Sequence, residues 1–281
     1  MIVSRQIDVP GARLYSEAIG SVTDTPVLLL MGAMASGLWW PEQFCRVLAA
    51  RGRFVLRYDH RDTGGSTKYP LGEPGYTVED MADDAIAVLG AFEITRAHLV
   101  GMSLGGFLAQ LIALKHPAHV SSLTLIASEP LGPGDPDIPG IDERVLQHHL
   151  LGAELDWSDR AAVVDFSTEG WRLLNGSAHA FDEAHIRHLA EEEYDRSGGS
   201  RSFMNHAFLS GGERWFGRLN EIRVPTLIIH GTDDIVLRYE NAHALQQQIP
   251  SSRLLTLQGS GHELHPADWE TVVSAIEAHT V

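Results

Sequence analysis

The sequence has few of the features that mark secreted, membrane-bound or nucleic-acid-binding proteins. It holds one cysteine, Cys45, in 281 residues, so no disulfide can form within the chain. Acidic residues outnumber basic ones by 37 to 21, and the formal net charge of −16 would repel nucleic acids and anionic membrane surfaces. The longest apolar run, residues 26–35, is too short and too rich in glycine to cross a bilayer. The first twenty residues lack the apolar core of a secretory signal. We therefore expect a cytoplasmic protein that binds neither nucleic acid nor membrane. The sequence does not indicate whether it is a monomer or an oligomer.

Short apolar segments alternate along the chain with segments of helical periodicity. Strands are predicted at 27–33, 53–59, 97–103, 121–128, 225–231 and 253–259, and helices at 77–92, 104–117, 239–250 and 266–280. Most of the strand segments are apolar nearly throughout, which is typical of parallel strands covered on both faces. The alternation predicts a mostly parallel, doubly wound α/β sheet, with the first twenty residues forming an antiparallel hairpin at its edge.

The alternation is interrupted once. Residues 129–143 are rich in proline, glycine and aspartate, and charged helical segments follow to about residue 214. We expect residues 129–214 to form a helical cap, and residues 1–128 and 215–281 to form the core. Such a cap would cover the carboxyl ends of the strands, which is where ligands bind in open α/β sheets.

One serine stands between glycines where a predicted strand meets a predicted helix. Gly101, Ser103 and Gly105 form a G-x-S-x-G pattern. In a nucleophile elbow the serine occupies a tight, strained turn that lifts its hydroxyl clear of the sheet, and its neighbours must be small. An ordinary glycine-rich loop is the plainer interpretation. The dinucleotide-binding fingerprint does not fit, because Ser103 stands where its second glycine would be.

A serine hydroxyl needs a base within hydrogen-bond reach and an acid that orients this base. On folds with an elbow, the acid and then the histidine follow the serine in loops after late strands. His262 lies just past the last predicted strand, and Asp233 and Asp234 just past the one before it. His265 lies farther from the strand end. Zinc binding through H-E-x-x-H does not fit, because residue 266 is proline.

Acyl transfer also needs hydrogen-bond donors for the oxyanion. The amide of Leu104, the residue after the nucleophile, is one expected donor. The second should come from the loop after the first parallel strand, and we expect it to be Ala33. Such a donor contributes about 3–4 kcal/mol to stabilising the transition state. The reaction implies no metal and no organic cofactor.

With these residues in place, the chain resembles the α/β-hydrolase fold over nearly its whole length outside the cap. The segments LLLMGAMASGLWWPEQF (28–44) and RYDHRDTGGST (57–67) resemble the aclacinomycin (anthracycline) methylesterases in particular. The resemblance implies a triad of Ser103, Asp234 and His262, with oxyanion donors at Ala33 and Leu104. It favours Asp234 over Asp233, and Glu129 is a third candidate because some members of the fold take their acid from that position.

In the methylesterase group the reaction is hydrolysis of a methyl ester on a bulky aromatic polyketide, and we expect a carboxylic ester with an apolar or aromatic acyl part. Met34, Trp39, Trp40 and Met102 are expected to line the substrate pocket, and packing in the core is the alternative for each. A lactonase, a carbon–carbon bond hydrolase or a cofactor-free perhydrolase would use the same triad. A non-catalytic receptor for a small ligand is the rival from another class.

Overall fold

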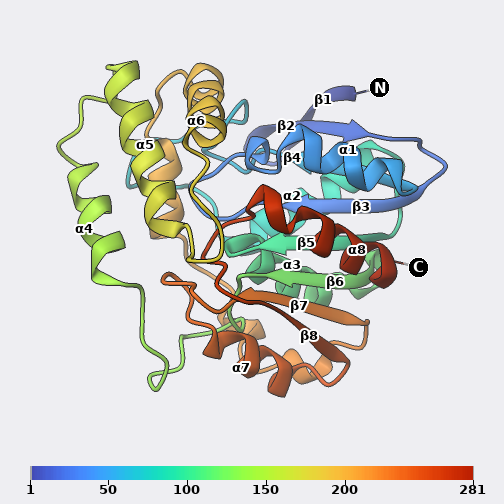
Figure 1. The fold of residues 1–281 in the computed structure, drawn as a ribbon. Coiled ribbons are helices and arrows are strands. Elements are labelled where there is room, and N and C mark those ends of the chain that lie inside the picture. Colours follow the sequence, from blue (N-terminus) through green and yellow to red (C-terminus); the bar gives the residue numbers. More distant parts are fainter. Residues whose placement is uncertain (1, 281) are drawn as a thin grey trace.

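The computed structural model describes residues 2–280, and its centre is one eight-stranded sheet (Figure 1). The strands are β1 (Ile2–Val9), β2 (Ala12–Ile19), β3 (Thr25–Leu30), β4 (Arg53–Tyr58), β5 (Ala97–Met102), β6 (Val120–Ile126), β7 (Thr226–Gly231) and β8 (Ser252–Leu257). Their order across the sheet is β1-β2-β4-β3-β5-β6-β7-β8. β1 and β2 form an antiparallel edge hairpin, and β3 to β8 are parallel. The predicted fold class is confirmed.

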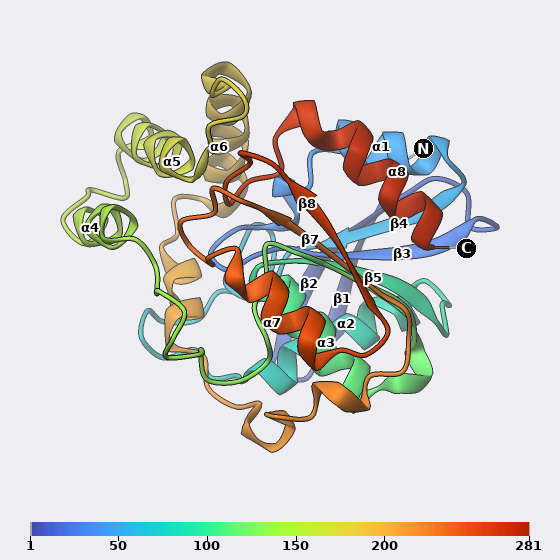
Figure 2. The ribbon, with the colours of Figure 1, turned by 60° about the horizontal axis from the view of Figure 1, so that its bottom comes forward.

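Helices cover both faces of this sheet, which explains why every residue of β4, β5 and β7 is buried. α1 (Glu42–Ala50) and α8 (Trp269–His279) pack on one face, and α2 (Val78–Ala91), α3 (Leu104–Lys115) and α7 (Glu240–Gln248) on the other (Figure 2). α2 begins with a capping box, in which Thr77 and Asp80 each bond the other's backbone N–H. Each predicted helix is present, with small shifts at its ends.

Three further helices follow β6 and precede β7 in the chain, and they lie together beyond one end of the sheet (Figure 1). They are α4 (Glu143–Leu151), α5 (Arg160–Leu174) and α6 (Glu183–Ser197). Short 3-10 helices occur at six places along the described chain: η1 (Gly37–Trp39), η2 (Pro117–His119), η3 (Ser202–Phe208), η4 (Glu213–Trp215), η5 (Leu219–Glu221) and η6 (Pro266–Asp268). We call the segment from 129 to 214 the insert.

The turn after β4 fastens the insert to the core. Asp59 is 1% exposed and accepts hydrogen bonds from the Gly37 amide at 2.9 Å and from the Arg196 guanidinium of α6 at 2.6 Å. Beside it, Arg61 forms two bonds of 2.7 and 2.8 Å to Asp84 of α2, and both side chains are buried. Removing one partner of a buried ion pair is costly, because it leaves the other charge buried and uncompensated. These bonds therefore hold the turn after β4 against α2 and α6.

Candidate active site

Ser103 lies in a strained turn between β5 and α3. Its backbone has φ 52° and ψ −119°, a region that residues other than glycine rarely adopt. The neighbouring glycines have no room for a side chain: a Cβ at Gly101 would overlap the carbonyl group of Gly105, and a Cβ at Gly105 would overlap that of Leu30. The glycines therefore permit the sharp turn that the G-x-S-x-G pattern predicts, and larger residues at these two positions would not fit it.

A histidine and an aspartate from two later loops meet next to this turn. His262 Nδ1 and Asp234 Oδ2 are 2.7 Å apart, and the two residues are 6% and 2% exposed. The other carboxylate oxygen, Oδ1, accepts the backbone N–H of Val236 at 2.8 Å and of Leu237 at 2.9 Å. Because β7 and β8 are parallel neighbours, the loops that follow them open at the same edge, and this brings Asp234 to His262.

The electrostatics of the pair suit a general base. Burial alone would lower the pKa of His262, but the Asp234 carboxylate beside it outweighs burial, and the pKa is raised above its ordinary value. Burial alone would raise the pKa of Asp234, but His262 and His230 hold it well below its usual range. The carboxylate therefore stays ionised and stabilises a protonated His262.

The other acid candidates lie elsewhere. Asp233 makes no hydrogen bond to His262 and accepts one from the Ser177 hydroxyl of the insert at 2.5 Å. Glu129 is close enough to His262 to affect it electrostatically, and burial raises its pKa, but it makes no hydrogen bond to the imidazole. His265 binds the carbonyl oxygen of Ala180 at 3.1 Å. Among the three acids, only Asp234 bonds the imidazole.

The expected oxyanion donors lie near Ser103. Leu104 is the first residue of α3, and Ala33 lines the same cavity as Ser103. The loop that carries Ala33 runs close by, since a Cβ built at Gly32 would lie 3.3 Å from the Ser103 Cβ. Within residues 2–280, neither the Ala33 nor the Leu104 N–H has a backbone acceptor outside regular helix and strand bonding. The Leu104 N–H lies at the start of a helix and the Ala33 N–H in a loop, and an N–H without a backbone acceptor suits a developing negative charge.

The serine and the histidine open into one cavity of about 380 Å³ between the core and the insert. Its walls are mostly apolar and aromatic: Met34, Trp39, Val145, Trp157, Phe166, Trp171, Leu174 and Phe203. Glu193 of α6 also reaches it, hydrogen-bonded to Ser36, and burial raises the pKa of Glu193. In the described structure no hydrogen bond joins Ser103 to His262. Catalytic bonds of this type often close only when substrate binds.

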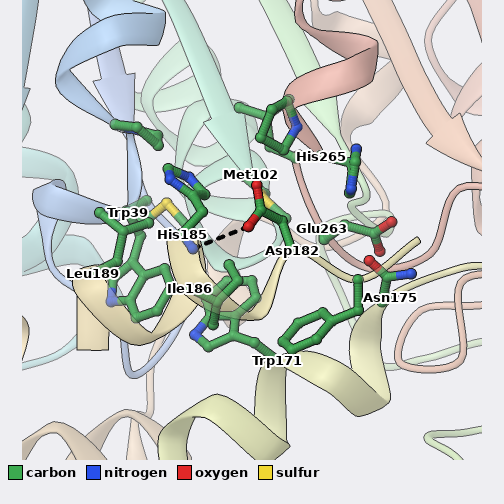
Figure 3. Close-up of a pocket in the computed structure, with 15 residues that line it drawn as sticks. Trp39, Met102, Trp171, Asn175, Asp182, His185, Ile186, Leu189, Glu263 and His265 are labelled. Atoms are coloured by element: carbon green, nitrogen blue, oxygen red, sulfur yellow. Dashed lines mark hydrogen bonds between the residues drawn. The ribbon is translucent and has the colours of Figure 1, made fainter. Parts of the chain in front are cut away.

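A second, smaller cavity of about 40 Å³ adjoins the first (Figure 3). Trp39 of η1 and Trp171 of α5 stack with ring centroids 4.3 Å apart and line both cavities, so the pair is their shared wall. Met102 lines only this smaller cavity, together with Glu263 and His185. Of the four expected pocket residues, the structure thus brings Met34 and Trp39 to the larger cavity and Met102 to the smaller one.

Trp40 lines neither cavity, which corrects the expectation that it contacts substrate. It is fully buried and packs on Phe44 of α1 with ring centroids 5.6 Å apart. Conversely, sequence reasoning missed contributions of the insert. His148 stacks on Phe166 with ring centroids 4.1 Å apart and lines the larger cavity.

The described residues, 2–280, contain no group of three or more His, Cys, Asp or Glu side chains arranged to hold a metal ion. No helix among them has the length and the apolar character needed to cross a membrane.

Comparison with known proteins identifies the family. A sequence profile of the alpha/beta hydrolase fold matches residues 25–267. The chain is 33% identical to rhodomycin D methylesterase DauP of Streptomyces sp. (strain C5), across 99% of this chain and 98% of the relative. It is 31% identical to the DnrP methylesterase of Streptomyces peucetius over the same shares. An esterase structure from Exiguobacterium antarcticum superposes with a TM-score of 0.80 at 25% identity, covering 99% of both chains. The chain therefore belongs to the α/β hydrolase fold family, among the carboxylic ester hydrolases of that family.

Proposed function

We propose that the chain hydrolyses the methyl ester of a bulky aromatic, polyketide-like acid through an acyl-enzyme on Ser103. The observation that carries the proposal is the larger cavity, in which Ser103 and His262 face a wall of aromatic side chains. The methylesterases that match along the full chain support the choice of a methyl ester.

In the first half of the reaction, Ser103 Oγ attacks the ester carbonyl carbon while His262 Nε2 takes the hydroxyl proton. The carbonyl electrons move onto oxygen, and the N–H groups of Ala33 and Leu104 hold the resulting oxyanion. Asp234 accepts the Nδ1–H of His262 and stabilises the imidazolium. The tetrahedral intermediate then collapses, and methanol leaves with the proton that His262 returns.

The second half repeats these steps with water. His262 deprotonates a water molecule that attacks the acyl carbon, the same two amides hold the new oxyanion, and Ser103 leaves as its hydroxyl when the proton returns. The carboxylic acid is released, and the enzyme returns to its starting state.

The shape and chemistry of the larger cavity support a flat aromatic acyl group. Its volume of about 380 Å³ lies within the usual range for small-molecule sites, about 300–1,000 Å³. The stacked pair of Trp39 and Trp171 lines one side of the cavity, and aromatic ligands pack well against aromatic rings. A methyl group is a small alcohol portion, so the acyl portion of such an ester would fill most of the cavity.

The test measures hydrolysis of methyl 2-naphthoate and of methyl acetate by the wild type, by Ser103→Ala and by Ser21→Ala. Ser21 is an exposed serine in the loop after β2 and serves as the matched control. We expect a higher kcat/KM for the naphthoate, a loss of about 10³-fold or more in Ser103→Ala, and no change in Ser21→Ala. A wild type that binds the naphthoate but releases no methanol would refute the proposal in favour of a receptor. Preference for the acetate would refute the aromatic substrate.

A further inference from the structure

A buried histidine of the insert reaches the loop that carries the expected oxyanion donor. His206 lies in η3 and is 7% exposed. Its Nδ1 accepts the backbone N–H of Met34 at 2.9 Å, and its Nε2 lies 2.9 Å from the carbonyl oxygen of Arg61. An amide N–H can only donate and a carbonyl oxygen can only accept, so the ring is the neutral tautomer that carries its proton on Nε2. Both ring nitrogens are therefore committed to backbone groups.

The residue that His206 holds has a strained backbone. Met34 has φ 65°, in the left-handed region that favours glycine. A conformation of this kind persists only when its surroundings hold it. Met34 follows Ala33 directly, so the bond from Met34 N–H to His206 fixes the peptide plane between them. The Ala33 N–H belongs to the preceding peptide unit, which is joined to this plane through the Ala33 Cα, so holding the plane restrains the direction of that N–H.

The turn that carries His206 is itself well anchored. Ser202 Oγ donates to the carbonyl oxygen of Asp62 at 2.9 Å, and Asn205 Nδ2 donates to the Asp62 carboxylate at 3.0 Å. Asn205 also accepts the Gly72 N–H at 2.7 Å. Ser202, Asn205 and His206 are all buried, and they form one polar side of η3 that faces the loop after β4. His206 is the residue of this side that bonds the Met34 amide.

A second buried imidazole, that of His60, contacts the same 31–36 loop at Met31. His60 Nε2 lies 3.0 Å from the carbonyl oxygen of Met31, and the ring centroids of His60 and His206 are 6.1 Å apart. Burial, together with His206, lowers the pKa of His60 to about 3, and burial lowers that of His206. Neutral rings suit their bonds, because protonation of His206 would remove the acceptor for Met34.

We propose that His206 is a positioning residue for the oxyanion hole: through the Met34 amide it holds the 31–36 loop so that the Ala33 N–H points at the ester oxygen. This inference rests on the proposed function. His206 touches no reacting atom and acts through the backbone of the loop.

Two substitutions separate the two bonds of the ring. In His206→Asn, Oδ1 takes the place of Nδ1 and can still accept from Met34. In His206→Gln, Nε2 takes the place of the imidazole Nε2 and can still donate to Arg61, but the acceptor for Met34 is gone. Both variants lose one hydrogen bond and shorten the ring to an amide, so they are matched in their general disturbance of η3.

The readouts are kcat for methyl 2-naphthoate, affinity for 2-naphthylboronic acid, and affinity for 2-(methoxymethyl)naphthalene. The boronic acid forms a tetrahedral adduct with the serine and places an oxygen in the oxyanion hole, whereas the ether has no carbonyl. For His206→Gln we expect kcat and boronic acid affinity to fall together by about 10- to 100-fold, with ether affinity unchanged. His206→Asn should stay within a few-fold of the wild type.

Three results would overturn the inference: full kcat in a folded His206→Gln, equal losses in both variants, or an equal loss of affinity for the ether. If neither variant folds, a wild-type measurement decides. Nuclear magnetic resonance detects a scalar coupling between the two nitrogens of an N–H···N bond, so a coupling between Met34 N and His206 Nδ1 is expected, and its absence refutes the arrangement. The proposed function fails separately, if the wild type hydrolyses no ester.

Discussion

Replacing Glu263 by glutamine should remove a pH-dependent loss of stability from the fold. Glu263 follows His262, and its Oε1 accepts the backbone N–H of Gly176 and of Gly261, both at 3.2 Å. Its Oε2 is buried and has no hydrogen-bond partner among residues 2–280. A charged carboxylate in this position is poorly compensated, so the protonated form is favoured.

The size of the effect follows from the pKa. Burial raises the pKa of Glu263 from 4.5 to about 7. The folded state thus holds this proton more tightly than the unfolded state does. The free energy of unfolding therefore falls as pH rises above the unfolded value, and the loss is complete once pH exceeds the folded value of about 7. At 1.36 kcal/mol for each pKa unit, the difference corresponds to about 3 kcal/mol.

Urea denaturation of the wild type and of Glu263→Gln between about pH 4.5 and about pH 8.5 measures this directly. Glutamine keeps an acceptor for Gly176 and Gly261 but carries no charge. The free energy of unfolding of the variant, relative to that of the wild type, should rise by about 3 kcal/mol between the two ends of this pH range, and the rise should begin near the acidic end. Taking the difference cancels the titration of buried groups that are not coupled to Glu263, such as His60 and His206, whereas His262 is coupled to Glu263 and contributes to the difference. Glu154→Gln, at an exposed glutamate, is the control.

Parallel stability curves for the wild type and Glu263→Gln, whether they coincide or differ by a uniform offset, would refute this reasoning, because they would mean that Glu263 titrates alike in the folded and unfolded states. Only a difference that grows with pH supports a buried carboxyl that loses its proton at a cost.

Three further outcomes are expected. Asp234→Asn should lower kcat by about 10⁴-fold. The acidic limb of kcat/KM, which we expect to follow the raised pKa of His262, should move to lower pH in this variant, and an unmoved limb in pH–rate profiles would contradict the pairing. Gly105→Ala should cost at least about 1–3 kcal/mol in urea denaturation, because its methyl group would overlap the backbone of β3, and a neutral result would contradict the tight elbow. Trp171→Ala should join the two cavities and lower the preference for methyl 2-naphthoate over larger aromatic methyl esters, measured as the ratio of kcat/KM values, and an unchanged ratio would contradict the shared wall.

The sheet and the meeting of Ser103, His262 and Asp234 could be predicted from sequence because each rests on a local rule. Fully apolar runs mark strands covered on both faces, and residues just past parallel strands gather at one edge of the sheet. The glycines on both sides of Ser103 indicate that neighbouring backbone leaves no room for a side chain there. Whether these three residues act as a catalytic triad is still a prediction, which the variants above test.

The environment of neighbouring tryptophans could not be predicted in the same way. Trp39 and Trp40 are adjacent and equally apolar, and they lie at the end of a 3-10 turn rather than in a long helix or strand with a clear period. Trp39 turns toward the insert and stacks on Trp171, whereas Trp40 turns into the core against Phe44. Only the packing of distant elements distinguishes them.

His206 was beyond sequence reasoning for a related cause. Its partner Met34 lies 172 residues away, and η3 is too short to show a hydrophobic period. One signal was present: Ser202, Asn205 and His206 have the i, i+3, i+4 spacing that puts residues on one side of a helical turn. A polar side of this kind ordinarily faces water, so the spacing predicts a shared direction but not burial.

The insert does more than cover the cavity, since its backbone and side chains hold parts of the site itself. His206 holds the loop that carries Ala33, and the carbonyl oxygen of Leu174 at the end of α5 accepts the backbone N–H of His262 at 2.9 Å. The fit there is close, because a Cβ at Gly261 would overlap that same Leu174 oxygen. Moving the insert away as one body would break both bonds. We therefore expect substitutions in the insert that break either bond to lower kcat as well as to change the choice of substrate.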